Sequence, residues 1–299
     1  MALYYENISA KTRFLNVFRR ALANSAADPV IAALVRKLPL LRNFTGKFVP
    51  PEYLYKKPSY RNYNVSGLKM KLDISNLVDH FIYFSFEHKA IDNFIDQLKP
   101  EDTVIDAGAN IGYTTLLFAK KCRKGTVISF EPSKELFEKV KEHAKLNSLT
   151  NIEALNLGLG EREATVRLVQ IDEFNTGKNK ILGDDKSYIR SENVHIKTLD
   201  EILASKGNPR VNAIKIDVEG YEHNVLKGAC KTLTDMRPIL MIEVDDHHLR
   251  EQQSSRQQLF KFLHELKYKA VNADSLQPIN LTEDYENPHF DIICFPINA

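Results

Sequence analysis

Three carboxylates, Asp217, Glu219 and Glu222, lie close together around the end of an apolar run at residues 213–218. A carboxylate at the end of a buried strand can act as a general base and take a proton from a substrate hydroxyl. Acids at such positions also stabilise helix N-termini, and Glu222 stands where such a residue would be. Three acids so close together favour a catalytic role over helix capping alone. We therefore predict that all three belong to a catalytic group in which Asp217 or Glu219 is the base.

A second apolar run, residues 239–244, leads into a sequence rich in acids and histidines, residues 243–248. These side chains could bind a divalent ion together with Asp217, but their spacing fits no stringent metal signature. We therefore predict no metal. Glu243 and His247 are instead expected to contact the substrate.

A glycine-spaced turn at residues 108–112 follows a third apolar run and precedes a helix-like sequence. Such a strand–turn–helix junction directs backbone N–H groups and a helix dipole at a ligand above the sheet. The middle glycine of the dinucleotide fingerprint is absent, because Ala109 and Asn110 follow Gly108. The ligand is therefore expected to lack a pyrophosphate. Asp106 adds a negative charge able to hold a ligand ammonium group.

Glu131 lies nineteen residues beyond Gly112, at the end of the next apolar run. An acid at that position can accept hydrogen bonds from both hydroxyls of a ribose. Together with the glycine turn it indicates a nucleoside ligand. Ser133 fits an N-cap for the helix that follows, which needs no ligand to explain it.

Apolar strands alternate with helical patterns through this part of the chain, which predicts a mostly parallel sheet covered on both faces. The expected strands are residues 103–106, 126–131, 152–157, 213–218 and 239–244, and the expected helices are 89–98, 114–121, 134–147, 221–232 and 249–267. Two strands at 164–170 and 194–197 flank a polar segment, residues 172–190, that we expect to be a mobile loop closing over the site. Thr198 and Glu201 form a capping box. The final strands, 269–272 and 290–295, have no helix between them, so the last one should be antiparallel.

The N-terminal region has a different character. Residues 11–41 show two helical patterns separated by Asp28-Pro29, residues 50–58 are rich in proline and tyrosine, and a hairpin signal spans 60–74. The first sixty residues carry ten Lys and Arg against three Asp and Glu. The apolar and basic face could lie on a membrane, although we favour helices packed on the main domain or on a second subunit.

Bulk properties describe an ordinary globular chain of 299 residues with a net charge of +2. The three cysteines lie far apart and share no metal-like spacing, which is typical of buried thiols in a reducing compartment. The sequence contains no run of roughly 18 apolar residues that could span a membrane, and its start does not resemble a signal peptide. We therefore expect a cytoplasmic protein.

Three motifs together resemble the FkbM family of methyltransferases. They are D-A-G-A-N-I-G-Y at residues 106–113, F-E-P at 130–132, and K-I-D-V-E-G-Y-E at 215–222, which is followed by Ile242-Glu243. The resemblance covers roughly residues 84–296. It implies an α/β fold, a Rossmann-like seven-stranded class I methyltransferase sheet of order 3-2-1-4-5-7-6, here with an N-terminal helical extension and hairpin. The expected division is a basic extension and linker at residues 1–58 and a methyltransferase domain at 59–299.

The resemblance also implies an S-adenosyl-L-methionine-dependent O-methyltransferase acting on a hydroxyl of a sugar, glycan or other small metabolite. It would place Asp106, Gly108, Asn110 and Gly112 around the methionine part, Glu131 at the ribose, Asn156 to Gly158 at the adenine and Glu87 facing the amino group, with Tyr113 and Ser133 completing the set. We expect no nucleic-acid partner and leave oligomer formation open. Two alternatives stay open: a nicotinamide-dependent oxidoreductase or epimerase, and a non-catalytic binding protein with a methyltransferase fold.

Overall fold

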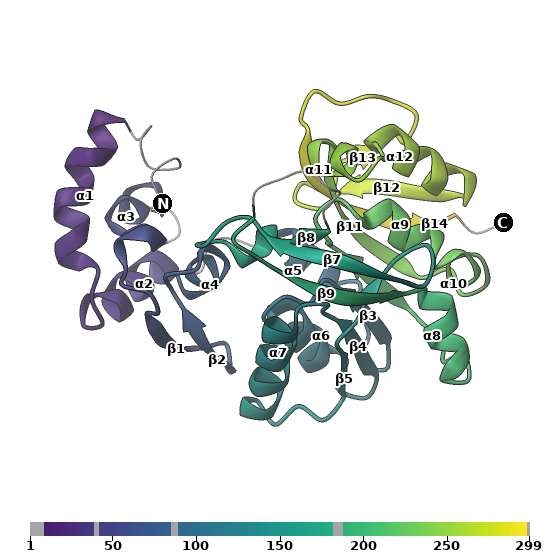
Figure 1. The fold of residues 1–299 in the computed structure, drawn as a ribbon, viewed down its shortest axis with the longest axis horizontal. Helices are drawn as coiled ribbons and strands as arrows, with labels where there is room; N and C mark the ends of the chain where they lie inside the picture. The colour runs from purple at the N-terminus through teal and green to yellow at the C-terminus, as the bar shows by residue number, and fades with distance from the viewer. Residues whose placement is uncertain (1–8, 39–41, 85–88, 182–187, 298–299) are drawn as a thin grey trace. The chain divides into compact units, whose positions relative to one another are not determined.

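The computed structural model describes residues 9–38, 42–84, 89–181 and 188–297, and the chain forms two compact units. Unit 1 comprises residues 1–87 together with 173–177, and unit 2 comprises residues 88–172 and 178–299. Figure 1 shows the elements of each unit. Among the described residues, no helix is both long and apolar enough to cross a bilayer.

Unit 1 consists of short helices and one hairpin. Its elements are α1 (Ala10–Leu22), α2 (Ala27–Lys37), α3 (Arg42–Thr45), η2 (Gly46–Phe48), η3 (Glu52–Leu54), β1 (Tyr60–Val65), β2 (Leu68–Asp73) and α4 (Leu77–Tyr83). The fully buried Asp28 holds them together by accepting hydrogen bonds from the Tyr55 hydroxyl at 2.7 Å and from Arg61 Nε at 2.8 Å. The two predicted N-terminal helices and the hairpin are therefore confirmed.

The hairpin lies on the other side of the expected domain boundary. The sequence places it in the methyltransferase domain from residue 59, whereas among the described residues β1 and β2 pair only with each other and lie in unit 1. Within that unit, the backbone N–H of Asp73 at the end of β2 donates to the carboxylate of Asp79 in α4. The division between the units falls at residues 87 and 88.

Unit 2 is built on an eight-stranded sheet of order β13-β12-β14-β11-β10-β3-β4-β5. The strands are β3 (Thr103–Ala107), β4 (Thr126–Phe130), β5 (Ile152–Leu155), β10 (Ala213–Ile216), β11 (Ile239–Asp245), β12 (Tyr268–Asn272), β13 (Pro278–Ile279) and β14 (His289–Pro296). Without the two-residue edge strand β13, this is the predicted 3-2-1-4-5-7-6 arrangement. The last strand, β14, is antiparallel to β11 and β12, which confirms that prediction.

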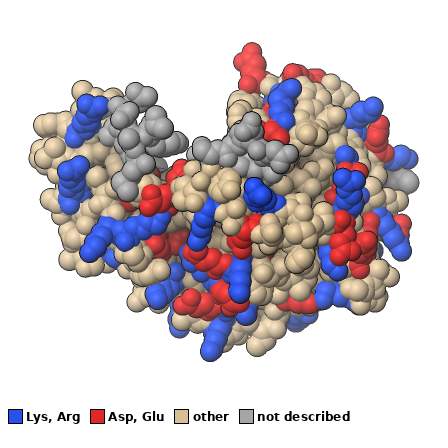
Figure 2. Space-filling view, viewed as in Figure 1, with Lys and Arg blue, Asp and Glu red and all other residues tan. Residues whose placement is uncertain are grey.

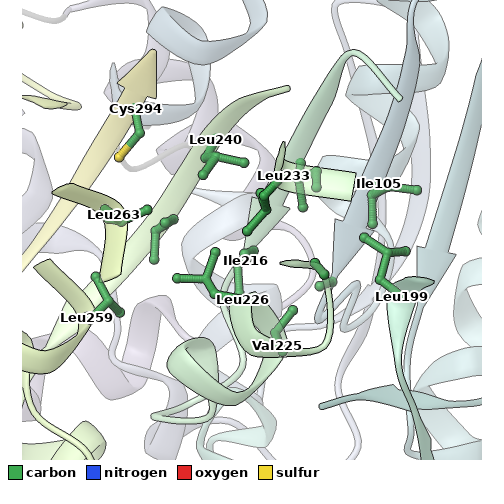
Figure 3. Close-up of a cluster of buried hydrophobic side chains, with 14 of the residues drawn as sticks. Ile105, Leu199, Ile216, Val225, Leu226, Leu233, Leu240, Leu259, Leu263 and Cys294 are labelled. Carbon is green, nitrogen blue, oxygen red and sulfur yellow. The ribbon is translucent and has the colours of Figure 1, made fainter. Parts of the chain in front are cut away.

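Helices cover both faces of this sheet. The helices are α5 (Lys89–Ile95), α6 (Tyr113–Lys121), α7 (Lys134–Leu146), α8 (Leu199–Ser205), α9 (Glu222–Lys227), α10 (Cys230–Asp235), α11 (Asp246–Glu251) and α12 (Arg256–Glu265). On one face, α8, α9, α10 and α12 bury their apolar side chains against β3, β10, β11 and β14 (Figure 3). On the other, Phe94 of α5 and Phe118 of α6 pack against the sheet. This burial fixes Ile216 at the end of β10, directly before Asp217.

Two predicted helices are interrupted. The helix expected at residues 221–232 is split into α9 and α10 at Gly228, where an added Cβ would lie 1.9 Å from the carbonyl oxygen of Gly160. The helix expected at 249–267 is split into α11 and α12 at Gln253, whose φ is +58°. Ser255 then caps α12 by accepting from the backbone N–H of Gln258.

The segment between β5 and β10 is more ordered than the sequence indicates. A second sheet of order β6-β9-β7-β8 contains β6 (Gly158–Leu159), β7 (Ala164–Gln170), β8 (Lys180–Ile181) and β9 (Arg190–Lys197). The strands at 164–170 and 194–197 are thus confirmed, and the second begins four residues earlier than expected. Part of the expected loop forms η4 (Thr176–Lys178) and β8, while residues 182–187 lie outside the described part. Thr198 and Glu201 make the predicted capping box.

Candidate active site

The glycine turn joins β3 to α6 in a backbone conformation that few residues adopt. Gly108, Asn110 and Gly112 have φ angles of +82°, +50° and +89°. A Cβ on Gly108 would lie 1.9 Å from the backbone oxygen of Asp217. Glycine at this position therefore allows the turn to lie directly against the carboxyl end of β10. The predicted ligand-binding turn and the predicted catalytic acids are thus in contact.

Asp106 lies beneath this turn and is fully buried. Its Oδ2 accepts hydrogen bonds from the hydroxyls of Thr114 and Thr115, at 2.8 and 2.6 Å. Its Oδ1 is buried without a hydrogen-bond partner among the described residues and lies 3.6 Å from Lys215 Nζ. The structure thus places Asp106 as an internal support that joins the start of α6 to β10, where the sequence suggested a carboxylate available to a ligand ammonium.

Glu131 follows β4, and its carboxylate faces the glycine turn. One oxygen accepts from the backbone N–H of Asn110 at 2.8 Å and the other from that of Ser133 at 2.9 Å. Burial raises the pKa of Glu131 to about 8, although both backbone hydrogen bonds oppose the shift. Because each carboxylate oxygen can accept more than one hydrogen bond, the group can still bind ligand hydroxyls.

Asn156 supports the backbone around Glu131. Its side-chain amide donates to the carbonyl oxygens of Glu131 and Pro132, at 2.9 and 2.8 Å. Ser133 is buried and lies at the N-cap of α7, but its hydroxyl makes no capping bond. A cavity of about 250 Å³ opens beside Ser133, between the start of α7 and strands β7 and β9, with Gln170 and Arg190 in its lining.

Lys215 connects the glycine turn to the acids and was not singled out from the sequence. Its buried ammonium donates to the Gly108 carbonyl oxygen at 2.9 Å and lies 3.1 Å from the Asp217 carboxylate. Burial acts to lower the pKa of Lys215, but the charges of Asp217 and Asp106 outweigh that effect and raise it. A lysine in the middle of the apolar run Ala213–Ile216 was the available signal, because a buried lysine requires a partner.

Glu219 lies in the loop after β10 with its backbone in the left-handed region, at φ +55°. Its carboxylate lies 3.1 Å from His248 Nδ1 at the start of α11, and the two form an ion pair when His248 is protonated. Burial raises the pKa of Glu219, with His248 opposing the shift, and the carboxylate raises the pKa of His248. The next residue, Gly220, approaches so closely that an added Cβ would lie 2.4 Å from the carbonyl oxygen of His248.

Glu222 is 1% exposed. One carboxylate oxygen accepts from the backbone N–H groups of Val218 and Gly220, both at 3.0 Å. Its other oxygen is buried and has no hydrogen-bond partner in the described part of the chain. Burial raises the pKa of Glu222 to about 7. Glu222 therefore holds the loop that carries Glu219.

Glu243 and His247 occupy different environments. Burial and the charges of Asp217 and Glu219 raise the pKa of Glu243 well above its usual range. One of its oxygens is buried, and no described residue forms a hydrogen bond with it. His247 is exposed at the start of α11. The neighbouring Asp291 of β14, another residue that the sequence did not indicate, also has its pKa raised, to about 6, by burial.

Two groups of side chains in the described part of the chain have the spacing of metal ligands. They are Glu219, Glu243 and His248, and Asp245, His247 and His248, with one ligand atom from each residue lying within 4.8 Å of the others. In the first group, the His248 ring already contacts the carboxylate of Glu219. In the second, Asp245 caps α11 by accepting from the backbone N–H groups of His247 and His248.

Three predicted site residues remain, namely Tyr113, Gly158 and Glu87. Tyr113 is the first residue of α6, and Gly158 lies in β6, where an added Cβ would be 2.4 Å from the Ile196 side chain. Glu87 lies outside the described residues. The structure thus brings Gly108, Asn110, Glu131, Asp217 and Glu219 into one region, with Lys215 as the link.

The comparisons with known proteins bear on the family of the chain. A family model for the methyltransferase FkbM domain matches residues 106–270, more than half of the chain. Methyltransferase 1 of Beauveria bassiana is 29% identical over 185 residues, covering 54% of this chain and 73% of that protein. Hexuronic acid methyltransferase AglP of Haloferax volcanii is 26% identical over 157 residues, covering 52% of this chain and 61% of AglP.

Among solved structures, a methyltransferase FkbM from Methylobacillus flagellatus aligns with a TM-score of 0.48 and 15% identity, covering 88% of this chain and 60% of that one. The assignment of family rests on the sequence match across all three motifs, which begins at Asp106 and extends into β12. The chain belongs to the FkbM family of methyltransferases.

Proposed function

We propose that this methyltransferase uses S-adenosyl-L-methionine to methylate a hydroxyl group on a sugar, glycan or other small metabolite. The observation that carries the proposal is the direct contact of the glycine turn, which Glu131 faces, with the acidic end of β10. A nucleoside donor and a proton-accepting group can then act side by side.

The residues of the turn fit the cofactor. Asn110 Oδ1 is buried and accepts no hydrogen bond from any residue that the structure describes, so it can accept one from a ligand donor. The remaining lone pairs of Glu131 suit the ribose hydroxyls. Gly108 and Gly112 would contact the methionine part through their backbone. When bound, the cofactor supplies an electrophilic methyl group on sulfur.

The protein must then align the acceptor hydroxyl and remove its proton. A sugar hydroxyl does not ionise by itself near neutral pH, so a carboxylate must take the proton as the new bond forms. Glu219 suits this function because burial raises its pKa, which makes the carboxylate a stronger base. Asp217 is the alternative, held by Lys215 and nearly half exposed. Glu243 and His247 would contact the acceptor.

The proposal of a sugar acceptor draws support from AglP, a relative whose name describes a hexuronic acid methyltransferase. The cavity beside Ser133 is lined by polar side chains that include Arg190 and Gln170, but not by Asp217, Glu219, Glu243 or His247, so we do not assign the acceptor to it.

The test is transfer of a labelled methyl group from S-adenosyl-L-methionine to hexuronic acids, neutral sugars and a cell extract, followed by identification of the product. We expect the label in a methyl ether that survives mild base. Label in a base-labile ester or on nitrogen would contradict O-methylation of a hydroxyl.

Two variants test the proposed base. Asp217→Asn and Glu219→Gln should each bind S-adenosylhomocysteine in calorimetry as the unaltered protein does, while at least one loses turnover by about 100-fold or more. If both variants keep full turnover, neither carboxylate is the base. The exposed Glu161→Gln serves as the matched control for loss of an acid.

A further inference from the structure

The helices of unit 1 present an apolar surface outward. Fifteen large hydrophobic side chains are exposed among the described residues, and eight of them lie between residues 14 and 48. We name the three of these on α1, Phe14, Val17 and Phe18, the N-terminal apolar surface. This region precedes the segment that matches the family model, so the methyltransferase reaction does not account for it.

On α1 the apolar residues form a stripe on the outer side of the helix. Phe14 and Val17 are 65% and 66% exposed, and the Phe14 ring packs edge-on against that of Phe18 at 5.3 Å. These positions follow the i, i+3, i+4 spacing of one helix face. Within unit 1 this face is exposed, so it is available to a partner outside the unit.

The inner side of α1 is held to unit 1 by polar contacts. The buried Asn16 donates to the Tyr53 hydroxyl at 2.9 Å, and Arg19 Nε donates to the backbone oxygen of Lys47 at 2.8 Å. The usual pattern, in which a surface helix buries its largest apolar side chains, is therefore reversed. The contacts of Asn16 and Arg19 fix which side of α1 faces outward.

Positive charge accompanies the apolar stripe. Besides the inward-facing Arg19, the helix α1 carries Lys11, Arg13 and Arg20 and contains no Asp or Glu, and Lys37 ends α2. Figure 2 shows blue Lys and Arg atoms among tan surface over the part that Figure 1 labels α1. Aromatic and aliphatic side chains beside lysine and arginine, without acids, are the composition of a helix that lies in the interface of an anionic bilayer.

From the apolar stripe and its flanking cations, we infer that the N-terminal apolar surface docks on an anionic lipid membrane, with Phe14, Val17 and Phe18 of α1 inserted among the headgroups. A second copy of the chain is a poorer occupant, because a symmetric interface would bring the same cations together. Lipid phosphates supply the opposite charge, and the acyl boundary accepts the aromatic rings.

The experiment is cosedimentation of the full-length protein with vesicles of phosphatidylcholine, with and without about 30% phosphatidylserine. We expect binding to the anionic vesicles that is released by roughly 0.5 M salt, and weak binding to pure phosphatidylcholine. Phe14→Ser with Phe18→Ser should lower the partition coefficient by about tenfold or more. Lys11→Glu with Arg20→Glu should lower it to a similar extent, on anionic vesicles only.

The matched control is Leu146→Ser with Ile297→Ser, which removes two side chains of similar exposure from unit 2. These changes should leave vesicle binding unaltered, and thermal unfolding of all variants should match the unaltered protein. Absence of binding to anionic vesicles, equal binding to neutral ones, or an equal loss in the control would overturn the inference. So would a dimer in sedimentation equilibrium that the Phe14 and Phe18 changes dissociate, because the surface would then be a subunit interface.

Discussion

The ammonium of Lys215 lies 3.1 Å from the carboxylate of Asp217. Through its hydrogen bond to the Gly108 carbonyl oxygen, the same ammonium also fixes the glycine turn. One buried cation thus sets the distance between the surface that would hold the methyl donor and the acids that would act on the acceptor.

Replacement of Lys215 by Met should therefore impair both stability and turnover. The change leaves the buried Asp106 without its nearby cation, which should lower the free energy of unfolding by about 3 kcal/mol. We expect kcat to fall by about 100-fold, because Asp217 and the turn lose their common support. Lys227→Met is the control, since Lys227 makes a half-exposed ion pair with Glu161. Urea unfolding and methyl transfer measure the two effects, and full turnover in Lys215→Met would disprove the proposed support.

Gly108→Ala should abolish the close contact between the turn and β10. An added Cβ would overlap the Asp217 carbonyl oxygen, and the positive φ would strain the backbone in addition. Gly207→Ala is the control for backbone strain alone, because Gly207 has φ +79° and no described atom lies within 4 Å of an added Cβ. We expect Gly207→Ala to lower the unfolding free energy by about 1 kcal/mol without changing cofactor affinity. Gly108→Ala should weaken S-adenosylhomocysteine binding by about tenfold or more in calorimetry, and equal affinities would contradict the contact.

The unliganded protein should lose stability as the pH rises toward 8, partly through Glu131. Burial raises the pKa of Glu131 from its ordinary value of 4.5 to about 8. The folded state therefore binds this proton more tightly than the unfolded state. The resulting stabilisation is complete below pH 4.5 and is lost as the pH rises through the folded-state pKa. Urea unfolding between about pH 5 and pH 8 should show a weaker pH dependence for Glu131→Gln than for the unaltered protein. Identical slopes would refute this shift, and Glu161→Gln controls for an exposed acid.

The pair formed by Glu219 and His248 should set the acid limb of the rate profile. If Glu219 is the base, kcat falls as the pH drops through its raised pKa, because the protonated carboxyl cannot accept the hydroxyl proton. His248 opposes the raised pKa of Glu219, so His248→Asn should raise that pKa further and move the acid limb to higher pH. His247→Asn should alter KM for the acceptor and leave the limb in place. An unmoved limb in His248→Asn would assign the proton to another group.

Chelation should leave methyl transfer unchanged, as the sequence predicted no metal. The comparison is activity before and after dialysis against EDTA, with the metal content of the protein measured in parallel. Loss of activity that Mn²⁺ restores would instead mean that Glu219, Glu243 and His248, whose ligand atoms are grouped within 4.8 Å, hold an ion.

The strand order was predicted through the family resemblance that the three motifs carry. Local apolar runs in the sequence marked the individual parallel strands, and the motifs lie at the ends of three of them, β3, β4 and β10. The breaks in the helices could not be predicted from the sequence, since they depend on long-range contacts such as that between Gly228 and the Gly160 carbonyl. The same holds for Lys215, whose importance comes from carboxylates brought to it by strand pairing. Helical periodicity found Phe14 and Phe18 but could not tell which side of α1 would face outward, because Asn16 and Arg19 decide that through distant partners.

Residues 173–177 belong to unit 1, although β7 before them and β8 after them belong to unit 2. Within unit 1, the Phe174 carbonyl oxygen accepts from the backbone N–H of Leu77, and the Thr176 hydroxyl donates to the Asn76 side chain. A protein shortened to begin at residue 88 would lose these partners in the middle of its remaining chain. Unit 2 therefore cannot be isolated by an N-terminal truncation alone. A shortened enzyme would also need a designed replacement for residues 173–177.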